Sequence, residues 1–204
     1  MDRFFFQRAR LNVTGVFNLG GLISGVCPSL YEEMLGQANN RETAYHEAGH
    51  ALANHFLRAS LPLVEVTLRP SAVFQAWGVR AHCQYRRIAD PLNKVEHLKA
   101  RAVVCMASFP AVQIAFGPAL QAKGVSMDLQ QGLQFLRDAH RDLSDENVVR
   151  LLAMARWRAD NIVFKHQEKL HVLAAALLKR KTLSGAQVEE ILGPRTEAIL
   201  EPAF

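Results

Sequence analysis

The chain has 204 residues, of which 50% are hydrophobic and 21% are charged, and its formal net charge is +5. This balance is typical of a globular domain with a sizeable core, and it excludes disordered, collagen-like and disulfide-stapled chains. The three cysteines cannot all pair, so we expect reduced thiols and a cytoplasmic location. Because Lys and Arg are spread along the sequence, we expect no nucleic-acid partner.

The first forty residues give the weakest indication of secondary structure or function. The apolar run over residues 13–26 is shorter than the roughly 20 residues that cross a bilayer, so we expect no membrane span. We assign residues 1–40 to an N-terminal extension of unclear role, residues 41–193 to the main domain and residues 194–204 to a C-terminal tail.

The pattern becomes clear from residue 39 onwards. Asn39 or Asn40 can cap a helix, with Glu42 completing a capping box, and this helix should run to about Leu57. Alternating apolar and polar residues then predict a strand over residues 61–68, and a second strand is expected over residues 79–85.

Further helices are predicted from their start signals, which are a proline at the first helical position or a serine cap. They are expected over residues 91–116, 126–139, 144–181 and 184–192. Pro110 strains the first of them, and Gly193 ends the last, which Ser184 and Gln187 open with a capping box. The predicted fold class is therefore mainly α with a small β-hairpin or sheet.

The first helix contains a His-Glu-x-x-His motif. His46 and His50 are four residues apart and share one helical face, so their imidazole nitrogens can bind one metal ion. Glu47 lies beside that ion, where it can take a proton from activated water. Because Gly49 has no side chain, the helix can come close to the metal or to a neighbouring backbone at this position. The alternative is a pair of histidines that bond to backbone carbonyls on a half-buried helix.

A catalytic zinc ion requires a third protein ligand and an open position. Asp128 is the best candidate, because it lies in the first turn of a helix whose other spaced residues are apolar. It could equally compensate the helix dipole, and spacing does not separate the two readings. Cys83 could bind metal or be an ordinary buried thiol.

Five segments resemble the peptidase domain of the FtsH family of ATP-dependent zinc metalloproteases, in the family's order, and the last of them, residues 173–192, resembles its C-terminal helix pair. The first, residues 43–53, is similar to its T-A-x-H-E-A-G-H-A helix, and residues 124–129 are similar to its Gly-Ala-x-Asn-Asp-Leu segment. Residues 107–117 resemble a family helix that ends in Phe-Gly, and Trp77-Gly78-Val79-Arg80 resembles a family strand. The resemblance extends over residues 43–192.

The resemblance implies a mostly helical zinc endopeptidase domain with its small sheet near the active site. Its Zn²⁺ ligands would be His46, His50 and Asp128, and its general base would be Glu47. An extended substrate would add to the edge strand that begins with Trp77, Gly78, Val79 and Arg80.

The sequence also departs from the family. It has no G-x-x-x-x-G-K-[ST] motif of the family's ATPase module, Met127 replaces the Asn before the third ligand, and Val112-Gln113 replaces an acidic pair. We therefore expect a zinc-dependent endopeptidase of unfolded polypeptides that lacks its own ATPase. A separate unfoldase and a homo-oligomeric ring are compatible with it. The alternative is a non-catalytic, zinc-binding interaction or regulatory subunit, against which the intact His46-Glu47-His50 argues.

Overall fold

The computed structural model describes residues 28–57, 59–69, 72, 81–86, 93–117 and 125–195. The chain divides into two compact units, Met1–Ala38 and Asn39–Phe204. In the first unit the described residues, 28–38, are helical. Three sequence expectations lie outside the described residues: the short apolar run over residues 13–26, the strand segment Trp77-Gly78-Val79-Arg80 and the helix start at residues 90–91.

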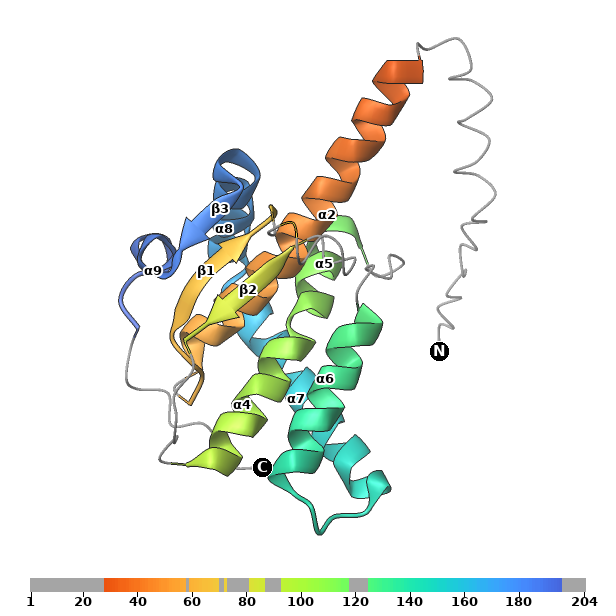
Figure 1. Ribbon diagram of the computed structural model, residues 1–204, viewed down its shortest axis with the longest axis vertical. Coiled ribbons are helices and arrows are strands. Elements are labelled where there is room, and N and C mark those ends of the chain that lie inside the picture. The colour runs from red at the N-terminus through yellow and green to blue at the C-terminus, as the bar shows by residue number, and fades with distance from the viewer. Residues whose placement is uncertain are drawn as a thin grey trace, which may run out of the picture. The chain divides into compact units, whose positions relative to one another are not determined.

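Helices dominate the described chain, and a three-stranded sheet accompanies them, so the predicted mainly α fold class is confirmed. The elements in chain order (Figure 1) are α2 (Pro28–Phe56), β1 (Leu63–Thr67), β2 (His82–Tyr85), α4 (Lys94–Met106), α5 (Ser108–Phe116), α6 (Val125–Ala139), α7 (Asp145–Lys165), α8 (Gln167–Arg180), β3 (Thr182–Ser184) and α9 (Gly185–Leu192).

The sheet has the order β2-β1-β3, and both pairings are antiparallel. Val66 at the centre pairs with Cys83 on β2 and with Leu183 on β3. The strand predicted over residues 61–68 is confirmed as β1, and β2 forms the second half of the other predicted strand. β3 was not predicted, because three residues are too few to show an alternating pattern.

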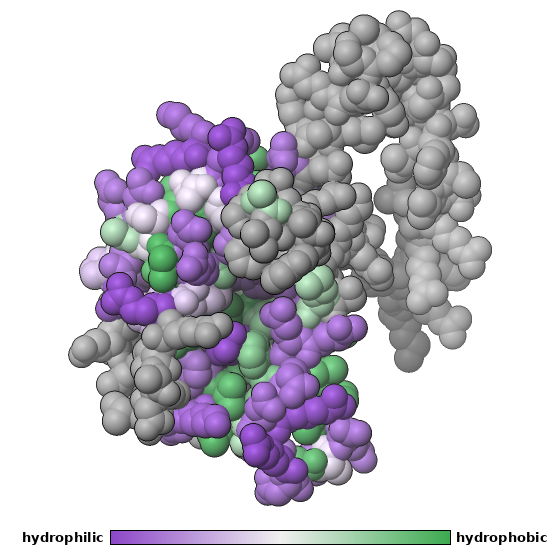
Figure 2. All heavy atoms as spheres, viewed as in Figure 1, coloured by the Kyte–Doolittle hydropathy of each residue, from purple (hydrophilic) through white to green (hydrophobic). Residues whose placement is uncertain are grey.

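The buried apolar core draws on α2, α4, α6, α7 and α8 and on the sheet, and α4 packs against α6 and α7, which run side by side in Figure 1. The span Lys94–Phe116, which covers α4 and α5, is long and apolar enough to cross a membrane by length and composition. Within the domain, however, 72% of its most apolar window is buried, as in the core helices of globular proteins. Hydrophilic residues cover most of the coloured surface on the face shown in Figure 2.

The helix that carries the His-Glu-x-x-His motif begins earlier than the sequence predicts. α2 starts at Pro28, so the predicted cap at Asn39 or Asn40 is wrong, and both residues lie inside the helix. The upstream residues favour helix, with a proline at the first position and Glu, Met and Leu after it. The predicted end near Leu57 is confirmed, since α2 ends at Phe56.

The C-terminal end of α2 is capped by the side chain of Arg195, which lies near the C-terminus of the chain. The guanidinium of Arg195 donates to the carbonyl oxygens of Asn54, His55 and Leu57 at 3.2, 3.3 and 2.8 Å. These are carbonyls that a helix end leaves without intrahelical partners, and a cation there also complements the helix dipole. Arg195 lies in the segment that the sequence assigns to a tail, 194–204.

The helix predicted over residues 91–116 is two helices. α4 begins at Lys94, where the Asn93 side chain accepts a hydrogen bond from the backbone amide of Glu96. The break falls at Ala107, because Pro110 has no amide hydrogen to continue the ladder toward Met106. Such a break lets α5 take its own direction.

The long helix predicted over residues 144–181 also divides, at His166, into α7 and α8. No proline or glycine marks this position, but the His166 ring stacks on Phe56 at the end of α2, with ring centroids 3.8 Å apart. The caps predicted at Ser144 and at Ser184 with Gln187 are confirmed. α6 begins at Val125, one residue before the predicted cap.

Candidate metal centre

The two histidines of the motif lie on one face of α2 and point toward the same place. His46 and His50 are 9% and 8% exposed, and their Nε2 atoms are 3.1 Å apart. The shared face follows from the helical period, which brings residues four apart into register. Two nitrogens that converge in a buried place can hold a common ligand.

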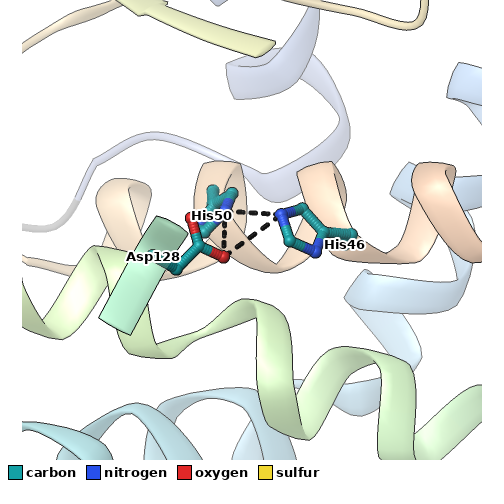
Figure 3. Close-up of side chains that lie close together, drawn as sticks. All are labelled: His46, His50 and Asp128. Atoms are coloured by element: carbon teal, nitrogen blue, oxygen red, sulfur yellow. Dashed lines mark hydrogen bonds and ion pairs between the residues drawn. The ribbon is translucent and has the colours of Figure 1, made fainter. Parts of the chain in front are cut away.

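Asp128 reaches the same place from the first turn of α6. Its Oδ2 atom lies 3.2 Å from Nε2 of His46 and 3.4 Å from Nε2 of His50. Figure 3 shows the carboxylate directed at the two imidazoles of α2. The three side chains that the sequence singled out as ligands are therefore brought together, although α2 and α6 are far apart in the chain.

These distances fit a zinc ion. An ion bound tetrahedrally at about 2.1 Å from each ligand needs ligand atoms about 3.4 Å apart. The three observed separations lie between 3.1 and 3.4 Å. Two imidazoles and one carboxylate are also the type of donor set that catalytic zinc sites use, with a fourth position left for water or substrate.

Two of these three side chains, His50 and Asp128, make hydrogen bonds to α4 and α5 that fix their orientation. Nδ1 of His50 donates to the carbonyl oxygen of Val104 in α4 at 2.8 Å, which leaves Nε2 free to act as a ligand. Oγ of Ser108, at the start of α5, donates to Oδ2 of Asp128 at 2.6 Å. Nδ1 of His46 is buried and has no hydrogen-bond partner among the described residues.

Charge is distributed unequally over the site. Burial alone would lower the pKa of His50, but the Asp128 carboxylate outweighs it and raises that pKa to about 9. Burial, followed by the proximity of His50, lowers the pKa of His46 to about 4. Burial alone would raise the pKa of Asp128, but His50 holds it below its usual range. These directions apply to the chain without a metal ion, and an ion that binds here requires Nε2 of both imidazoles to be deprotonated.

Glu47 lies next to the first histidine and is 6% exposed. Burial raises its pKa to about 7, which suits a group that takes and returns protons near neutral pH. The thiol of Cys83 on β2 contacts it, with Sγ 3.5 Å from the Glu47 carbonyl oxygen, and burial raises the pKa of this thiol well above its ordinary value. Cys83 therefore contacts the predicted base.

Gly49 allows another backbone to come close to the motif. A Cβ at this position would lie 2.6 Å from the carbonyl oxygen of Ala107 and 2.6 Å from Cβ of Ala111. Of the two roles the sequence allowed, the structure shows the close approach to a neighbouring backbone. This contact sets α2 against the junction of α4 and α5, from which Val104 and Ser108 reach the ligands.

Sequence reasoning missed the supporting residues. Ser108 and the carbonyl of Val104 carry no motif, and a buried serine in an apolar helix gives no sign of its partner. The available signals that the surroundings of the ligands differ here were Met127, in place of the family's Asn, and Val112-Gln113, in place of its acidic pair.

The chain is similar to known proteins over most of its length. The family model described as Peptidase family M41 matches residues 33–139, which is more than half of the chain. A protein named ATP-dependent zinc metalloprotease FtsH from Rickettsia bellii is 26% identical over 197 residues, covering 79% of this chain and 30% of that protein.

Two eukaryotic proteins match as well. The yeast (Saccharomyces cerevisiae) mitochondrial inner membrane i-AAA protease supercomplex subunit YME1 is 26% identical, covering 78% of this chain and 24% of that protein. The Arabidopsis thaliana protein named ATP-dependent zinc metalloprotease FTSH 11, chloroplastic/mitochondrial, is 27% identical, covering 80% of this chain and 22% of that protein. The chain thus spans less than a third of the length of these relatives. It belongs to peptidase family M41, as an FtsH-like peptidase domain.

Proposed function

We propose that this chain is a zinc-dependent endopeptidase that hydrolyses peptide bonds of unfolded polypeptides. The observation that carries the proposal is the convergence of Nε2 of His46, Nε2 of His50 and Oδ2 of Asp128 within 3.1–3.4 Å of one another. The printed names of the relatives, zinc metalloprotease and protease subunit, support the same activity.

In this proposal His46, His50 and Asp128 hold the zinc ion. The bound ion supplies Lewis-acid activation of water and of the scissile carbonyl. Glu47 takes a proton from the attacking water at its carboxylate and returns it to the nitrogen of the leaving amine. Its raised pKa, about 7, suits both transfers, and its burial keeps other solvent away.

We further propose that substrate binds as an extended strand along the edge of β2. In the described sheet β2 pairs with β1 on one side, and Cys83 of this strand contacts Glu47. Pairing through main-chain hydrogen bonds tolerates many side chains, which suits unfolded substrates. The expectation that Trp77, Gly78, Val79 and Arg80 bind substrate belongs to the same proposal, and these four residues lie outside the described ones. A separate ATPase that delivers substrate and a homo-oligomeric ring are further parts of the proposal.

Cleavage of unfolded casein tests the proposal. The zinc-loaded wild-type chain should cut casein, and Glu47→Gln should bind zinc equally but lose at least about 100-fold in rate, because only the base is removed. Gel analysis measures the cleavage, and metal analysis measures the zinc content. If zinc-loaded wild type cuts neither casein nor short quenched peptides, the endopeptidase proposal is wrong and a non-catalytic module is favoured.

A further inference from the structure

We propose that Ser108 is a positioning residue of the metal centre, because its hydroxyl fixes the Asp128 carboxylate in the orientation that faces both histidines. This inference rests on the proposed zinc site. It concerns affinity for the ion and not the chemistry of hydrolysis.

The contact is short and fully enclosed. Ser108 is 0% exposed, and its Oγ lies 2.6 Å from Oδ2 of Asp128. The other acceptor nearby, the carbonyl oxygen of Cys105, is 3.4 Å away. Since a hydroxyl has one proton, the shorter bond to the carboxylate is the one it makes.

The bonded oxygen is the one that points to the histidines. Oδ2 of Asp128 is also the atom 3.2 and 3.4 Å from the two Nε2 atoms. A carboxylate oxygen has two lone pairs, so the serine proton can occupy one and leave the other for the ion. The serine bond thereby selects a single rotation of the carboxylate.

Asp128 depends on such a contact because the side chains beside it do not anchor the turn. Met127 and Leu129 are 58% and 39% exposed. Ser108, in contrast, is completely buried as the first residue of α5. Residues that orient metal ligands in this way typically contribute about 10–100-fold to metal affinity.

The test is a double-mutant cycle on zinc affinity, measured by competition with a chromophoric chelator at constant pH. Ser108→Ala should raise the zinc Kd by about 10–100-fold. In an Asp128→Ala background the same change should alter Kd by less than about twofold, because the hydroxyl then has no ligand to orient. Ser108→Cys, which keeps the volume but donates weakly, should resemble Ser108→Ala and serves if the alanine variant does not fold.

Ser60→Ala is the matched control. Ser60 is also buried, and its Oγ lies 2.6 and 2.7 Å from the carbonyl oxygens of Asn54 and Leu57, beyond the ligands on α2, so one of these carbonyls accepts its proton. Its loss should lower stability and leave the zinc Kd within about twofold. An unchanged Kd in Ser108→Ala, or an equal rise with and without Asp128, overturns the inference. Zinc-loaded protein that fails to cut casein overturns only the proposed activity.

Discussion

His55 lies one helical turn and a residue beyond His50, in a basic environment. It is 6% exposed, and its Nε2 has no hydrogen-bond partner among the described residues. Burial, and then the positive groups Arg195, Lys169 and His166, lower its pKa to about 4. The folded chain therefore keeps this imidazole neutral where an unfolded chain would protonate it.

Stability should consequently fall as the pH falls. Between pH 6.5 and pH 4 the unfolded chain binds more protons at His55 than the folded chain, so the free energy of unfolding decreases with falling pH. This one group should account for about 2 kcal/mol between pH 6.5 and 4.5. Urea unfolding at several pH values measures the slope. His55→Gln should flatten it by that amount, and an unchanged slope would contradict the assignment.

The roles of some residues of the site could be predicted from the sequence, and the roles of others could not. The roles of His46 and His50 are readable because helical geometry converts a spacing of four into a shared face. Asp128 needed the resemblance to separate a ligand from a helix-dipole charge. Ser108 and Val104 were not predictable, since their contacts depend on how α4 and α5 pack against α2 and α6.

Helix α2 contacts the junction of α4 and α5 at Gly49, and the contact leaves no space for a Cβ atom at this position. A Cβ there would lie 2.6 Å from the backbone oxygen of Ala107, which cannot move without shifting α5. Gly132 on α6 differs, because its Cβ would meet the side-chain ends of Met106 and Leu152 at 3.1 and 3.2 Å. These ends can rotate away.

Alanine at these two glycines should therefore have opposite effects. Both changes gain about 1 kcal/mol of helix propensity. Gly49→Ala also overpacks a backbone contact, at a cost of about 1–3 kcal/mol, and should lower the net stability. Gly132→Ala should leave stability equal or higher. Denaturant unfolding measures both, and equal stability of the two variants would show that the α2 contact is looser than the distances indicate.

The helices and strands that the sequence predicts correctly are those whose signals lie within a few neighbouring residues. The capping box at Ser184 and the strand β1 are each indicated by a few neighbouring residues, and both are confirmed. The predicted alternation of buried and exposed residues in β1 is wrong, because Val66 and Thr67 are both buried and Val64 is exposed. The break at His166 and the strand β3 were missed, because they depend on a ring stack with Phe56 and on pairing with β1. Tertiary contacts overrode a continuous helical pattern over residues 144–181.

At the scale of the whole domain, the candidate centre ties together parts that are distant in the chain. Its three side chains come from α2 and α6, and residues of α4 and α5 make hydrogen bonds to two of them. The buried apolar core, to which α2, α4, α6, α7 and α8 all contribute, is made of other side chains and does not include the ligands. We therefore expect the chain to fold without zinc and to gain stability when zinc binds.

The gain is set by mass action. A ligand that binds only the folded chain stabilises it by about 2.7 kcal/mol at a free concentration 100 times its Kd. For a domain of this size that corresponds to a rise in Tm of about 5–10 °C. Thermal unfolding of the zinc-loaded chain with and without a chelator measures the difference. Asp128→Ala should lose most of it, because the third ligand is gone, whereas Glu47→Gln should keep it. A chelator that leaves the wild-type Tm unchanged would show that His46, His50 and Asp128 do not bind the ion.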